Sequence, residues 1–146
     1  MEKNIIDILN KILTNTLDYK QVLQKLADSI THPSTSDRLN ELEESADGES
    51  KKIIKIISDM GGDVESSERL SDQESIYWMS RPLPDAGDLV SVWNSIIEAE
   101  RNKEDDYKYL LTHNDIDRET KNNLKTHLKK TESNITDFQA ILNELD

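Results

Sequence analysis

The residues best suited to chemistry in this chain are acidic and imidazole side chains on otherwise apolar helical faces. Glu49 and Glu100 each stand where an apolar series in steps of three and four would continue with Ile or Leu. His127 shares the apolar face of the last such segment, and Thr16 and Thr131 interrupt two of the stripes near their midpoints. Carboxylates and imidazoles bind metal ions, but inside a core they are also held by hydrogen bonds.

These residues are predicted to form one polar layer. If four helices of similar length stand side by side, Thr16, Glu49, Glu100 and Thr131 lie at about the same height. Glu49, Glu100 and His127 could then converge on one iron or manganese ion, because three ligands with open positions make a usable site. This is the first of two interpretations.

The second interpretation is purely structural, and we favour it. Here His127 and the two threonines hydrogen-bond the carboxylates, as buried polar groups require. Lys20 or Lys103 supplies the compensating charge. Incomplete polar layers specify the register of packing more often than they bind metal. We therefore expect no cofactor.

The composition indicates a helical protein with an acidic surface. The chain of 146 residues fits one domain (1–146), and 33% charged with 5% aromatic residues favours amphipathic helices over sheets. A formal net charge of −12 disfavours nucleic acid and membrane surfaces as partners. There is no cysteine, which excludes disulfides and thiol chemistry. The first residues enter helical periodicity without an apolar leader, so we expect a cytoplasmic protein.

Four helices are predicted from the apolar periodicity and its breakers. Pro33 and the pair Gly61-Gly62 end the first two, and Ser34, Thr35 or Ser36 could cap the second. We expect Asp85 to cap the third helix and Gly48 to mark a close approach between helices. The predicted helices cover residues 3–30, 36–60, 85–111 and 115–145.

The connections predict the topology. Short links join the first helix to the second and the third to the fourth, so each pair forms an antiparallel hairpin. The long link 63–84 lets the chain cross the length of the bundle. A capping-box pattern from Ser71 to Glu74, ahead of residues 76–79, predicts a short extra helix in this crossover. The predicted fold class is an all-α four-helix bundle with one crossover.

This pattern resembles the ferritin-like superfamily, and within it a branch of small bacterial four-helix proteins of undefined function. The resemblance rests on LNKILTNTLDYKQVLQKLAD near the start, the DMGGDV turn, and EAERNKEDDYKYLL in the third helix, besides the central Glu49 and Glu100. A di-iron member would need a single Glu on two helices and Glu-x-x-His on the other two. Glu49 and Glu100 match this ligand set. The four departures are Thr16, Lys52, Thr131 and Asn134.

The resemblance therefore implies a ferritin-like bundle with a degenerate di-metal site. We expect a non-enzymatic protein with a structural, stress-related or partner-binding role, able to form a homo-oligomer, whose protein partner the sequence does not identify. The first alternative is a metal-binding or redox protein that uses Glu49, Glu100 and His127. The second is a histidine phosphotransfer module, because His127-Leu128-Lys129-Lys130 resembles the His-x-x-Lys stretch of such domains, which need an exposed imidazole.

Overall fold

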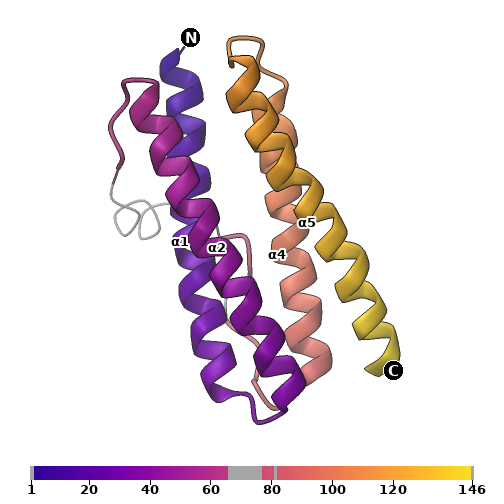
Figure 1. Ribbon diagram of the computed structural model, residues 1–146. Coiled ribbons are helices and arrows are strands. Elements are labelled where there is room, and N and C mark those ends of the chain that lie inside the picture. Colours follow the sequence, from indigo (N-terminus) through magenta and orange to yellow (C-terminus); the bar gives the residue numbers. More distant parts are fainter. Residues whose placement is uncertain (1, 66–76, 81, 146) are drawn as a thin grey trace.

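The computed structural model describes residues 2–65, 77–80 and 82–145, which contain four helices and no strand. These are α1 (Glu2–Ser29), α2 (Pro33–Asp59), α4 (Leu89–Leu111) and α5 (Arg118–Leu145). Figure 1 shows them side by side in one bundle. The predicted all-α four-helix fold is confirmed. No helix in the described part of the chain is both long and apolar enough to cross a membrane.

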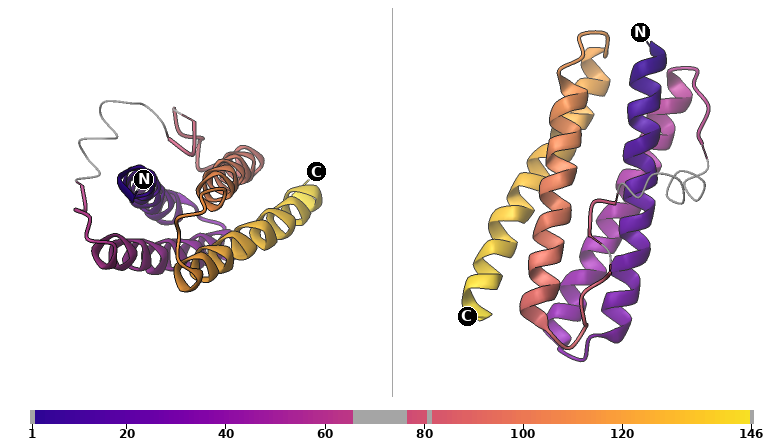
Figure 2. Two further views of the ribbon diagram at one scale, coloured as in Figure 1. Left: turned by 90° about the horizontal axis from the view of Figure 1, so that it is seen from above. Right: turned by 180° about the vertical axis from the view of Figure 1, so that it is seen from behind.

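The bundle consists of two antiparallel hairpins. α1 packs closely along α2 and α4 along α5, whereas the hairpins meet mainly through α1 and α4. α2 and α5 hardly touch each other. α2 ends at the opposite end of the bundle from the start of α4 (Figures 1 and 2), so the chain between them spans the bundle, as the crossover prediction requires.

The short extra helix predicted in the crossover is not confirmed. Its capping-box residues lie outside the described residues, and Tyr77–Ser80 are not helical. Trp78 nevertheless covers one flank of the bundle, because its ring is buried edge-on against Tyr19 of α1, with centroids 6.1 Å apart. Its Nε1 donates to Asp106 Oδ2 at 2.7 Å, and Asn102 Nδ2 donates to its carbonyl oxygen at 2.6 Å. These two hydrogen bonds fix the crossover to α4.

Three helix starts differ from the prediction. α5 begins at Arg118 instead of residue 115, because Asp117 caps it, with its Oδ2 accepting from Thr120 N at 3.2 Å. α2 begins at Pro33, because proline suits the first helical position, and His32 is the cap: its Nδ1 accepts from Thr35 N at 3.2 Å. α4 is capped by Asp88, whose Oδ1 accepts from Ser91 N at 3.1 Å. Asp85 instead closes a turn by accepting from Gly87 N at 2.9 Å. The hydrogen bonds of the local turn therefore decide which of several possible residues caps the helix.

The glycines of α2 and its C-terminus have different roles. Gly61 has a φ of 78°, the left-handed conformation that ends helices. A Cβ on Gly62 would lie 2.8 Å from two side-chain carbons of Ile6, so the close approach is here. A Cβ on Gly48 would meet nothing within 4 Å, and the expected close approach at Gly48 is therefore wrong.

We predict opposite effects for alanine at two of these glycines. Gly48→Ala raises the free energy of unfolding by about 0.5–1 kcal/mol, because alanine is the better residue inside an exposed helix. Gly62→Ala lowers it by about 1–3 kcal/mol, because its methyl group overpacks Ile6. Urea unfolding of both variants measures the difference. A Gly62→Ala variant that is more stable than Gly48→Ala would contradict the prediction.

Candidate functional site

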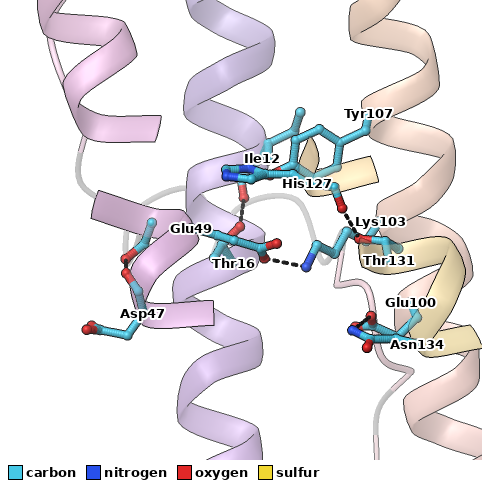
Figure 3. A network of polar contacts seen from close by, with 11 residues as sticks. Ile12, Thr16, Asp47, Glu49, Glu100, Lys103, Tyr107, His127, Thr131 and Asn134 are labelled. Atoms are coloured by element: carbon cyan, nitrogen blue, oxygen red, sulfur yellow. Dashed lines mark hydrogen bonds and ion pairs between the residues drawn. The ribbon is translucent and has the colours of Figure 1, made fainter. Parts of the chain in front are cut away.

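All four predicted interruptions are buried at the middle of the bundle (Figure 3). The exposed fractions are 0% for Thr16, 6% for Glu49, 0% for Glu100 and 0% for Thr131. Each comes from a different helix, so a polar layer does cross the core. We call this set of residues, with the side chains that contact it, the waist.

A buried lysine neutralises one of the two carboxylates of the waist. Lys103 Nζ of α4 forms an ion pair and hydrogen bond with Glu49 Oε1 of α2, and Lys103 is only 3% exposed. Burial alone would lower the pKa of Lys103, but the negative charges of Glu100 and Glu49 outweigh it and raise that pKa. Of the two lysines considered from the sequence, Lys103 is the compensating cation. Lys20 pairs with Asp47 at 2.8 Å near the surface.

Glu100 accepts a hydrogen bond from a neutral amide. Asn134 Nδ2 of α5 donates to Glu100 Oε1 at 3.1 Å. Glu100 Oε2 and the Tyr19 hydroxyl are both buried, and neither reaches good hydrogen-bond geometry with a described group. Burial first, and then the negative charge of the nearby Glu100, hold the pKa of Tyr19 well above its ordinary value. Tyr19 therefore stays protonated and can donate to this carboxylate.

His127 contacts a tyrosine and not the carboxylates. Its half-buried ring meets the Tyr107 ring edge-on, and its Nδ1 lies 3.2 Å from the Tyr107 hydroxyl oxygen. Burial lowers the pKa of His127; the charge of Glu49 raises it, but nearby lysines, Lys103 first among them, lower it further. The imidazole is therefore neutral at pH 7. The expected hydrogen bonds from His127 to the carboxylates are not found.

The two threonines also bond elsewhere than expected. Thr16 Oγ1 donates to Ile12 O at 2.7 Å and Thr131 Oγ1 donates to His127 O at 2.9 Å. Both carbonyls belong to the same helix as the threonine and lie one turn earlier, a bond that helical threonines commonly make. The predicted bonds from the threonines to Glu49 and Glu100 are therefore wrong, because the local acceptor is always within reach.

The waist does not fit a two-metal centre. Glu49 is bound by an ammonium, Glu100 by an amide, and His127 by a phenol. Within residues 2–65, 77–80 and 82–145, no three His, Asp or Glu side chains form a group that could hold a metal ion. An ammonium between the carboxylates also repels any second cation there.

The sequence could have indicated more of the waist than was predicted. Besides Lys103, which was predicted, Tyr107 follows Glu100 by seven residues, and Tyr19 follows Thr16 by three. These steps place each of them on the same helical face as the polar interruption. Which of these groups would contact which could not be known, because that depends on side-chain rotamers across helices.

Comparison with known proteins identifies the fold. No protein-family model matches this chain, and no curated protein matches it. The chain is similar to a solved structure described as a dodecameric thioferritin, the bacterioferritin-related protein from Bacteroides fragilis. The TM-score is 0.85 at 20% sequence identity, over 99% of this chain and 88% of the other. The fold is therefore the ferritin-like four-helix bundle, as the resemblance implied.

Removing the buried ammonium should be strongly destabilising. We predict that Lys103→Met lowers the free energy of unfolding by about 3–5 kcal/mol, because it leaves Glu49 buried without a cation. The double variant Lys103→Met with Glu49→Leu should recover most of this loss, because two apolar side chains replace the pair. Urea unfolding measures both. The matched control, Lys20→Met, breaks a partly exposed pair near the surface and should cost at most about 1 kcal/mol.

The waist should also make the protein sensitive to alkali. The pKa values of Lys103, Tyr19 and Tyr107 all lie above their ordinary values of 10.5, 10.0 and 10.0. Above about pH 10 the unfolded chain loses protons that the folded chain keeps, so stability falls with rising pH. We predict a loss of up to about 1.4 kcal/mol per pH unit for each group. Tyr19→Phe should remove one such contribution in urea titrations, and an unchanged slope would contradict the prediction.

Proposed function

On the basis of the ferritin-like fold, we propose that this protein is a non-enzymatic bundle in which an ion pair has replaced the di-metal centre. The observation that supports this most directly is the buried ammonium of Lys103 on Glu49. In a di-metal bundle the central carboxylates are neutralised by metal cations. Here a covalently attached cation does that work, and amide and phenol groups complete the waist.

Electrostatics make the ammonium and a metal ion alternatives in this space. Two cations a few ångströms apart in a medium of low dielectric constant repel by several kcal/mol. Lys103 would have to lose its proton for a metal to enter, yet its pKa is raised rather than lowered. The proposal therefore assigns no redox or ferroxidase reaction to Glu49 and Glu100.

The role we propose is that of a scaffold that assembles with itself or binds a partner protein. The protein of similar fold is described as dodecameric, which supports self-assembly of this chain as a proposal. A cytoplasmic location and a stress-related or structural role belong to the same proposal. The phosphotransfer alternative receives no support, because His127 is half-buried and lies against Tyr107.

Metal titration tests the proposal. We predict that purified wild-type protein shows no saturable binding of Mn²⁺ or, without oxygen, of Fe²⁺ in calorimetry, and no rise in melting temperature. Lys103→Met should bind Mn²⁺ more tightly than wild type, because the competing cation is gone. Glu100→Gln in the Lys103→Met background is the control and should abolish this gain. Stoichiometric, tight binding to the wild type that Glu100→Ala removes would overturn the proposal.

A further inference from the structure

Cavities line the boundary between α2 and α5. We call this boundary the seam. A cavity of about 220 Å³ lies in its middle, one of about 420 Å³ lies toward the end where α5 begins, and one of about 330 Å³ lies where α5 ends. All three have residues of both helices in their walls. The seam is thus an incompletely packed face of the bundle.

The charges on the two sides of the seam are complementary. The middle cavity is lined by Arg38 and Glu41 from α2 and by Asp137 and Lys130 from α5. None of these four side chains forms an ion pair with a described residue, and all four are exposed. Two complementary pairs of charges therefore face one another across the seam without meeting.

The same complementarity recurs at the end where α5 begins. Lys52 and Lys55 of α2 share a cavity wall with Glu119 of α5 and with Asp117 just before it. Within the part of the chain that the structure describes, none of the charged side chains of α5 forms an ion pair. In α2, by contrast, Lys55 pairs with Asp59 at 3.0 Å and Lys51 with Asp47 at 3.0 Å. α5 therefore presents an unpaired set of charges to the seam.

The core holds the seam open within one chain. Trp93 of α4 packs against Phe138 of α5 with ring centroids 5.1 Å apart and ring planes tilted by 46°, and both rings are buried. The Glu49–Lys103 pair fills the space between the hairpins at the waist. Drawing α2 toward α5 would compress these close-packed groups, which costs stability. The charges along the seam are therefore better satisfied by another molecule.

We propose that a second copy of this chain docks on the seam, with a twofold axis parallel to the helices. This inference rests on the self-assembly that the proposed function includes. Rotation about such an axis leaves every helix with the same direction and the same height along the axis. It therefore places α2 of one copy opposite α5 of the other. Arg38 then meets the partner's Asp137, and Glu41 meets the partner's Lys130. Ion pairs that do not form within one chain therefore form between the two copies.

Apolar side chains and the net charge both favour this one orientation of the second copy. Ile141 and Leu145 line the cavity where α5 ends, and 38% of Leu145 is exposed, whereas Leu42 and Phe138 in the wall of the middle cavity are already buried within one chain. Burial of Ile141 and Leu145 between copies favours association. Two copies that each carry −12 repel one another in most orientations. An orientation that pairs opposite charges is therefore strongly preferred over others.

Charge reversal tests the proposal directly. Arg38→Glu and Asp137→Arg each place like charges across the proposed interface, so each variant alone should dissociate at least about tenfold more readily than wild type. An equimolar mixture of the two should associate again, because each remaining pair in the mixed dimer joins opposite charges. Light scattering and sedimentation at low salt measure the masses. Lys25→Glu and Asp28→Arg on the exposed face of α1 are the matched controls and should leave association unchanged.

The outcomes distinguish docking on the seam from the wider proposal that the chain assembles with itself. A wild-type assembly that neither reversal weakens would overturn docking on the seam and leave self-assembly standing. A monomeric wild type would overturn both, while the ion-pair waist would still be judged by metal titration. If the mixture stays dissociated but the single chain carrying both reversals regains its melting temperature, the pairs form within one chain, and docking of a second copy is wrong.

Discussion

The packing of this bundle depends on how two buried negative charges are compensated in its core. Two carboxylates, Glu49 and Glu100, stand in a region from which water is excluded, and one ammonium is available to them. A buried carboxylate without a partner would cost several kcal/mol. The surrounding groups follow from that constraint: the Asn134 amide donates to Glu100, and Lys103 forms an ion pair with Glu49. Because Lys103 comes from α4 and Glu49 from α2, the pair also ties the two hairpins together.

Much of this architecture could be predicted from the sequence, for physical reasons. Helical periodicity makes a polar residue on an apolar stripe visible, so the burial of Glu49 and Glu100 followed from spacing alone. Link lengths determined which helices form hairpins. The contacts inside the layer could not be predicted, because side chains choose among acceptors of similar reach. Thr16 and Thr131 took the carbonyl one turn back, and His127 took Tyr107.

The errors at helix ends have a related cause. Several residues near an expected terminus can cap it, and the backbone geometry of the preceding turn decides among them. Pro33 fixed the start of α2 and left His32 as the cap, while Asp85 was used by a turn that placed Asp88 at the start of α4. Competing local hydrogen bonds thus shift boundaries by a few residues without changing the fold.

A cation carried on a side chain behaves differently from one drawn from solution. The ammonium of Lys103 is made with the chain, so its effective concentration at Glu49 does not vary with the supply of any ion. Folding in such a bundle needs no loading step, and a chelator has nothing to withdraw from that pair. In the function that we propose, the stability of the bundle at this pair therefore does not depend on the supply of metal ions in the cell.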